Sequence, residues 1–146
     1  MKLNIELTNK LELNTPIIGK IIKIGSKTIE QNIDKNTTKK VECFGCDIEF
    51  MGGADKPVNV SFIADPKIDG GSSYTSSKDS LTKFTQFCLN TSIVTVEDLI
   101  NKKGVEKNIL NSLPNLIGKK VECSILKNDK GYYQIDLDSL KIAESK

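Results

Sequence analysis

The sequence predicts a mainly β domain of five strands, with a helical insert between the third and fourth strands. Apolar and polar residues alternate with the period of a β-strand up to residue 64 and again between residues 121 and 137. Between these two regions, apolar residues recur at helical spacing. A chain of 146 residues is long enough for one domain with its own core and short for two, so residues 1–146 are treated as a single domain.

The first long strand is predicted over residues 17–24, where β-branched residues are dense. The next segment, residues 26–38, is polar and contains only two isolated isoleucines, Ile29 and Ile33. Two interpretations fit this segment: the strand continues and then turns, or the segment forms an exposed loop.

The second strand, predicted over residues 39–50, changes phase in its middle at Gly45. The apolar residues on the two sides of this glycine belong to opposite phases, Val41 and Cys43 against Cys46, Ile48 and Phe50. A β-bulge at Gly45 would restore one continuous inner face. Turn residues Gly52 and Gly53 then lead to a third strand, whose apolar phase is Val58, Val60, Phe62 and Ala64.

A polar loop and three helical signals follow the third strand. Residues 65–77 are rich in Gly, Ser and Thr and predict a mobile loop that carries Tyr74. Asp79 or Ser80 is suited to cap a helix, because Leu81, Phe84 and Cys88 then recur at helical spacing. A second helix is predicted to start at Thr95, and a third covers residues 105–113, before Pro114.

The C-terminal region predicts a closing hairpin. Its turn lies at residues 128–131, and inward-facing residues alternate on both sides of it: Val121, Cys123 and Ile125 before the turn, then Tyr133, Ile135 and Leu137 after it. Strands, a helical insert and a closing hairpin, in that order, give the layout of a five-stranded OB-like barrel.

Two short motifs in the last third of the chain carry a family resemblance. Residues 116–123, with Gly118-Lys119 at the start of a strand, and residues 131–135, with Gly131-Tyr132, resemble the closing hairpin of phage-type single-stranded DNA-binding proteins. The resemblance implies an OB fold that binds a single strand of DNA, or of RNA, in a sequence-tolerant way. It also implies a role in phage or plasmid replication or recombination, without a cofactor.

In such a groove, lysines follow the phosphates and aromatic rings stack on the bases. The first two strands, their connection and the closing hairpin supply the candidate lysines, because the loops of these elements flank one cleft in an OB barrel. The predicted nucleic-acid-binding residues are Lys20, Lys23, Lys27, Lys35, Lys39, Lys40, Phe44, Tyr74, Lys127, Lys130 and Tyr132. Phe44 has a second interpretation, in which it packs under the helical insert.

The amino-acid composition limits the kinds of catalysis that the chain can carry out. The chain has no His and no Arg, so imidazole-based acid/base catalysis, catalytic triads and guanidinium clamps on phosphate are excluded. Asp136 and Asp138, two apart on a predicted strand, would share a face as paired metal ligands do, which keeps a carboxylate enzyme as a third option. We nevertheless expect a protein that is not an enzyme and holds no metal.

The cysteines and the hydropathy pattern predict a reduced, cytoplasmic protein, in the host cytoplasm if the chain is viral. No apolar run reaches the length of a membrane span, and the first residues do not resemble a signal peptide. Cys43 and Cys46 have the C-x-x-C spacing of some metal sites. No second pair and no His completes such a site, so buried structural thiols are the favoured interpretation.

Charge also supports an alternative function. The 21 lysines and 19 acidic residues leave a net charge of only +2, and Glu42, Asp47 and Glu49 on the second strand would repel phosphate. A non-enzymatic viral structural or protein-interaction module is therefore the alternative, with a barrel edge or the loop at residues 65–77 as its contact surface.

Overall fold

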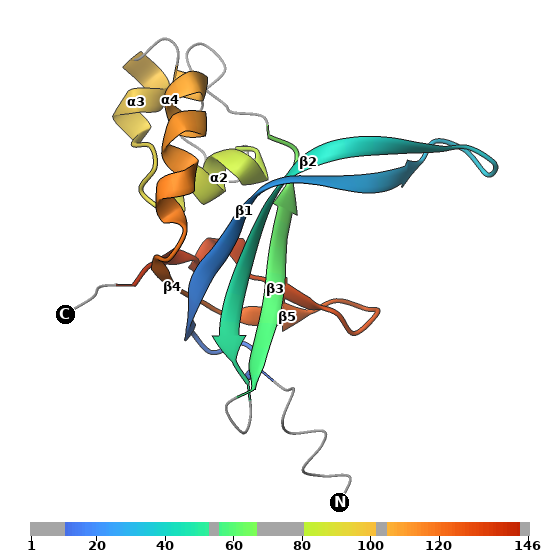
Figure 1. The fold of residues 1–146 in the computed structure, drawn as a ribbon, viewed down its shortest axis with the longest axis horizontal. Helices are drawn as coiled ribbons and strands as arrows, with labels where there is room; N and C mark the ends of the chain where they lie inside the picture. The colour runs from blue at the N-terminus through green and yellow to red at the C-terminus, as the bar shows by residue number, and fades with distance from the viewer. Residues whose placement is uncertain (1–10, 53–55, 67–80, 102–104, 144–146) are drawn as a thin grey trace, which may run out of the picture.

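The computed structural model describes residues 11–52, 56–66, 81–101 and 105–143, and Figure 1 shows the path of the chain. Three strands are followed by helices and then by four shorter strands. The elements are β1 (Ile17–Asn32), β2 (Thr38–Met51), β3 (Pro57–Ala64), α2 (Lys83–Asn90), α3 (Val96–Asn101), α4 (Val105–Ser112), the 3-10 helix η4 (Leu113–Leu116), β4 (Lys120–Cys123), β5 (Ile125–Lys127), β6 (Tyr133–Ile135), the 3-10 helix η5 (Leu137–Ser139) and β7 (Lys141–Ile142).

The predicted mainly β fold is confirmed, as is the helical insert between the third and fourth strands. Five strands form one antiparallel sheet in the order β3-β2-β1-β4-β7, and β5 and β6 form a separate two-stranded sheet. The sheet contains β7, which the sequence did not predict, as its fifth strand. β6 lies beside β3, but no strand pairing among the described residues joins them into a closed barrel.

The polar segment after residue 24 continues the first strand. β1 pairs with β2 along its length, from Gly19 opposite Phe50 to Asn32 opposite Thr38. By contrast, β3 reaches only Phe44 of β2, and β4 pairs only with the start of β1. Residues 25–43 therefore form a two-stranded ribbon that extends beyond the rest of the sheet (Figure 1), and we call this ribbon the arm.

The predicted β-bulge at Gly45 is wrong. Gly45 lies directly opposite Gly25 in regular register, and the irregularity falls in β1, between Ile21 and Lys23. The phase change in the sequence has another cause, because residues 43–46 are buried on both faces of β2. Phe44 and Cys46 face the core, while the side chain of Lys27 lies over Gly45 on the opposite face.

The inner face of the sheet packs against α2 through aromatic rings. Thr82 caps this helix, instead of the predicted Asp79 or Ser80, and its side-chain oxygen accepts a hydrogen bond from the Thr85 N–H at 3.2 Å. The rings of Phe62 and Phe87 stack with centroids 5.0 Å apart. The predicted helix start at Thr95 is confirmed by a reciprocal pair of hydrogen bonds between Thr95 and Asp98.

The C-terminal strands turn a corner at Ser124. Its N–H donates a hydrogen bond of 2.8 Å to Ser139 Oγ, and Ser124 separates β4 from β5 along the chain. The predicted closing strand is thus divided: β4 pairs with β1, and β5 pairs with β6. Ile125, immediately after the corner, is fully buried and anchors the β5–β6 hairpin in the core.

Candidate nucleic-acid interface

Two hairpins that lie far apart in sequence carry most of the predicted lysines. The arm and the β5–β6 hairpin project toward the same side of the molecule, the right-hand side of Figure 1, and β3 runs between their bases. We use outer face for the side of β1, β2 and β3 that carries Lys27, Asp47 and Ser61, opposite the core. The candidate interface consists of this outer face and the two hairpins that flank it.

Alternation places four of the predicted lysines on the outer face. The phase of β1 and β2 opposite the buried Ile21, Cys46 and Ile48 contains Lys20, Lys23, Lys27 and Lys39. Lys40 takes the other phase, and Lys35 lies in the turn of the arm. The fold therefore brings only some of the predicted lysines together. Within the arm, Lys27 and Lys39 lie on the outer face, and Lys35 and Lys40 do not.

Carboxylates neutralise part of this charge. Lys20 lies directly opposite Glu49, Lys23 opposite Asp47, and Lys40 opposite Glu30. Lys39 instead lies opposite the uncharged Gln31. Because opposite charges on facing strand positions attract one another, Lys39 is the better placed of the two adjacent arm lysines to attract a phosphate.

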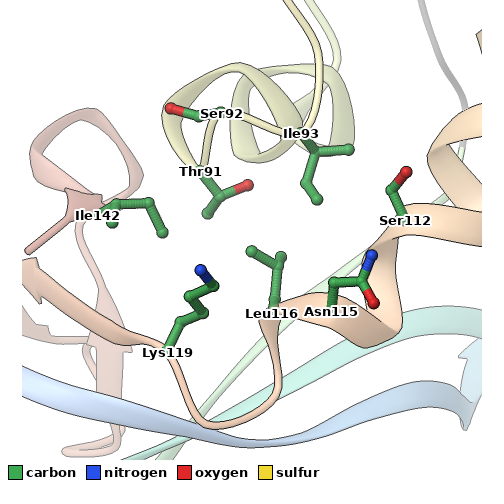
Figure 2. Close-up of a pocket in the computed structure, with 8 residues that line it drawn as sticks. All are labelled: Thr91, Ser92, Ile93, Ser112, Asn115, Leu116, Lys119 and Ile142. Carbon is green, nitrogen blue, oxygen red and sulfur yellow. The ribbon is translucent and has the colours of Figure 1, made fainter.

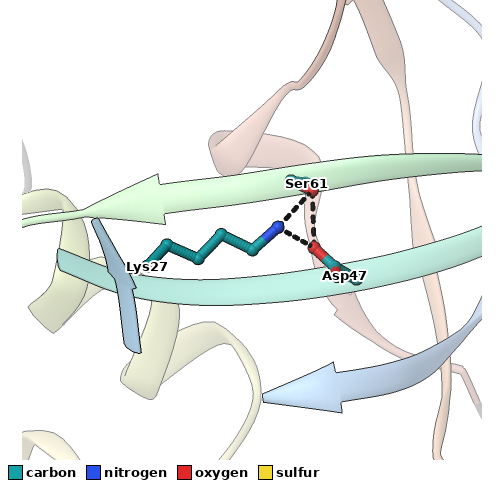
Figure 3. Close-up of polar contacts among 3 residues, drawn as sticks. All are labelled: Lys27, Asp47 and Ser61. Atoms are coloured by element: carbon teal, nitrogen blue, oxygen red, sulfur yellow. Dashed lines mark hydrogen bonds and ion pairs between the residues drawn. The ribbon is translucent and has the colours of Figure 1, made fainter. Parts of the chain in front are cut away.

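Lys27 is engaged in a polar cluster at the base of the arm (Figure 3). Its Nζ donates to Asp47 Oδ1 at 2.6 Å and to Ser61 Oγ at 3.1 Å, and Ser61 Oγ donates to the same carboxylate oxygen at 2.5 Å. To reach Asp47, the lysine stem crosses Gly45, where a Cβ atom would lie only 2.5 Å from Lys27 Cγ. The absence of a side chain at Gly45 therefore permits a contact that links β1 to β3 across β2.

The same contacts set the acidity of Asp47. Partial burial alone would raise the pKa of this carboxyl group, but the hydrogen bonds from Lys27 and Ser61, together with the charges of Lys27 and Lys23, outweigh it. The net result is an Asp47 pKa below its ordinary value. Asp47 is thus ionised at neutral pH and holds Lys27, so this lysine needs to exchange partners before it can contact a phosphate.

The tip of the β5–β6 hairpin is fixed by Asn128. Its side-chain oxygen accepts hydrogen bonds from the N–H groups of Lys130, at 3.0 Å, and Tyr132, at 2.9 Å. Gly131 adopts a φ of 87°, which favours glycine. This turn presents the Tyr132 ring with 67% of the residue exposed. Tyr132 is the one predominantly exposed aromatic residue in the part of the chain that the structure describes.

Lys127 and Tyr133 make a contact of their own at the base of this hairpin. Lys127 Nζ lies 5.4 Å from the centre of the Tyr133 ring, within the range of a cation–π interaction. The Tyr133 hydroxyl accepts a hydrogen bond of 3.0 Å from the Leu11 N–H. Alternation along β5 and β6 places both side chains on the side opposite Leu126 and Gln134. Lys127 therefore lies away from the surface that Leu126 presents.

The two remaining predicted stacking residues do not contribute to this surface. Phe44 is 6% exposed and packs against Phe62, Phe84 and Phe87, with its ring centre 4.9 Å from that of Phe84. It cannot stack on a base, and its alternative interpretation, packing under the helical insert, is confirmed. Tyr74 lies outside the described residues.

One surface cavity belongs to the candidate interface. It has a volume of about 280 Å³ and lies between β3 and the β5–β6 hairpin, where Ser61, Ile63, Leu126, Gln134 and Asp136 contribute to its lining. Of these residues, the sequence singled out only Asp136, as a possible metal ligand, and none as part of a nucleic-acid interface. Ile63 and Leu126 were the available signal, because both are apolar at outward strand positions, where an alternating strand places polar residues.

Two further cavities lie away from the outer face. One, of about 350 Å³, is lined by residues from the end of α2, by η4 and by Lys119 (Figure 2), on the side of the molecule away from the arm. The other, of about 370 Å³, is more apolar and lies between the arm base and α4, with Phe44, Leu110 and Leu113 in its lining.

The cysteines form no site among the described residues. Cys43 and Cys46 are three residues apart on a regularly paired strand, so their side chains point to opposite faces of β2. All four thiols are free and buried, and burial raises the pKa of Cys46, Cys88 and Cys123 to about 12. These three thiols are therefore protonated at neutral pH and unsuited to metal binding or nucleophilic chemistry.

The predicted carboxylate pair is also separated. β6 ends at Ile135, Asp136 precedes η5, and Asp138 lies within that 3-10 turn, so the two aspartates do not share a strand face. Within the described ranges, no group of three His, Cys, Asp or Glu side chains gathers to hold a metal ion. No helix in these ranges is long and apolar enough to cross a membrane.

Comparisons with protein-family models, with curated proteins and with solved structures found no match to this chain.

Proposed function

We propose that this chain binds single-stranded nucleic acid over its outer face, between the arm and the β5–β6 hairpin. The observation that carries the proposal is that two hairpins flank one sheet face on the same side of the molecule (Figure 1). The first hairpin carries Lys39, and the second carries Lys130 and Tyr132. Lysines neutralise phosphates, and an exposed ring stacks on a base of any sequence.

The strand order supports an OB-like architecture for this binding surface. A meander of β1, β2 and β3, a helical insert, and a last hairpin whose β6 lies beside β3 follow the connectivity of an OB barrel. In that architecture the loop between the first two strands and the loop of the last hairpin border the ligand. The setting that the resemblance implies is replication or recombination of phage or plasmid DNA.

The test is the salt dependence of binding to a fluorescently labelled single strand, measured by anisotropy with the full chain. The logarithm of the affinity should fall linearly with the logarithm of salt concentration, with a slope of about −0.7 for each phosphate that is neutralised. Lys39→Gln combined with Lys130→Gln should weaken binding and flatten this slope. The matched control combines Lys107→Gln with Lys119→Gln, two exposed lysines outside the candidate interface, and should leave the slope unchanged.

A second candidate function, protein interaction, is favoured by apolar side chains on the helical insert. Val96, Ile100 and Leu110 are between 48% and 62% exposed, and Leu110 borders the apolar cavity beside the arm base. Apolar surface of this kind often marks a protein contact. If the labelled strand does not bind at low salt, this second function replaces the first.

A further inference from the structure

We propose that the cavity between β3 and the β5–β6 hairpin is a pocket for one nucleobase with an exocyclic amino group. This inference deepens the proposed function and rests on it. The cavity of about 280 Å³ opens on the outer face, next to the Lys27, Asp47 and Ser61 cluster, with which it shares Ser61. A bound strand that lies over the outer face would therefore pass its entrance.

The apolar part of the lining suits a flat ring. Ile63 points outward from β3 and is 40% exposed, and Leu126 points outward from β5 and is 36% exposed. Each leaves apolar surface in contact with water, which a base inserted between the two strands would cover. Burial of this surface gives a favourable term that does not depend on base identity.

The polar part of the lining supplies selectivity. Gln134 and Asp136 both line the cavity, and neither side chain has a hydrogen-bond or ion-pair partner among the described residues. An ionised carboxylate only accepts hydrogen bonds. Asp136 therefore favours a base that presents an N–H₂ group, such as cytosine, and disfavours the carbonyl oxygen that uracil or thymine presents at the same ring position.

The backbone holds Asp136 in place for this role. The Asp136 N–H donates to the Ser124 carbonyl at 3.0 Å, and the Asp136 carbonyl accepts from Ser139 Oγ at 2.7 Å. These contacts tie the residue to the corner between β4 and β5. Lys83, at the start of α2, also borders the cavity and offers a cation for the phosphate of the inserted nucleotide.

The experiment compares oligodeoxycytidine with oligodeoxyuridine of equal length, at one salt concentration and neutral pH, on the full chain. The two oligonucleotides have the same backbone and the same ring size. A difference in affinity between them therefore comes from the hydrogen-bonding groups at the edge of the base. We expect about tenfold tighter binding of the cytidine strand, the effect of one hydrogen bond to a charged group. Asp136→Asn should reduce this ratio toward one, mainly by weakening the cytidine complex.

Asp138→Asn is the matched control, because it removes the same charge from an exposed carboxylate two residues further along the chain. It should leave the ratio of affinities unchanged, and thermal unfolding should show that both variants fold. Equal affinity of the unmodified chain for the two strands would overturn the base pocket while leaving single-strand binding intact. Equal effects of the two variants on the ratio would overturn the role of Asp136, and no binding of either strand would overturn both proposals.

Discussion

The arm and the β5–β6 hairpin present lysines in two different structural settings. Side chains of the arm from Gln31 to Lys40 are all exposed, so its ribbon depends on backbone hydrogen bonds and a few half-buried residues such as Ile29 and Val41. The β5–β6 hairpin has strands of only three residues, but Ile125 roots it in the core and Asn128 fixes its tip. The long, exposed arm can therefore extend to a ligand, whereas the short, buried β5–β6 hairpin holds its residues in a fixed position.

The largest expected difference between the two hairpins is in the stability that is lost when one apolar side chain in each is truncated. Ile125→Ala empties a fully buried position and should lower the free energy of unfolding by about 2–5 kcal/mol. Ile29→Ala in the arm removes a half-buried side chain and should cost less than about 1 kcal/mol. Urea denaturation of both variants measures the difference. Equal losses would show that the arm is anchored as firmly as the β5–β6 hairpin.

In each of the two turns, one side chain makes hydrogen bonds to the backbone. Asn128→Ala removes two hydrogen bonds to backbone N–H groups of the β5–β6 hairpin. Asp34→Ala in the arm removes the bond from Asn36 N–H, at 2.9 Å, and the contacts with Thr37. We expect Asn128→Ala to cost about 1–2 kcal/mol of stability. It should also weaken binding of a single strand, because Tyr132 loses its fixed orientation. Thermal unfolding measures the change in stability, and anisotropy measures the change in affinity. An unchanged affinity would show that the orientation of Tyr132 does not matter for binding.

Lowering the pH should weaken the contact between Asp47 and Lys27 at the base of the arm, because it protonates Asp47. Its pKa is lowered in the folded protein, so the ionised carboxylate contributes stability above its ordinary pKa of 3.8, and this contribution is lost as pH falls through the folded value. Asp47→Asn should reduce stability at pH 7 by about 1 kcal/mol and remove part of the acid-dependent loss. Unfolding measured from pH 7 to pH 3 tests this. An unchanged pH profile in the variant would show that the contact with Lys27 does not stabilise the fold.

Much of the fold could be predicted from the sequence because strong patterns determine it locally. The alternation of Val58, Val60 and Phe62 and the capping pair of Thr95 and Asp98 both depend on residues close in sequence. The arm could not be decided in the same way. Its residues are polar, and whether they form a strand depends on pairing with β2, which is a property of the tertiary structure.

The candidate site was less predictable, for a physical reason that Phe44 illustrates. Alternation placed Phe44 opposite the apparent inner phase, but burial of both faces of β2 at residues 43–46 removes the distinction between inside and outside there. Lys27 likewise was identified as a surface cation. Its Asp47 partner lies on the neighbouring strand, four residues beyond the Cys43 that faces Lys27, a diagonal contact that no sequence spacing reveals. Asp136 gained its place in the cavity only through the corner at Ser124.

The most direct test of the central claim is to map amide chemical shifts of the full chain while a short single strand is added. We expect the shifts that change to belong to Lys39, Ser61, Lys130 and Tyr132, on the outer face and its two hairpins. Thr91 and Lys119, which line the cavity on the opposite side, should stay unchanged. Changes confined to the surface around Leu110, or spread evenly over both sides of the molecule, would contradict binding between the arm and the β5–β6 hairpin.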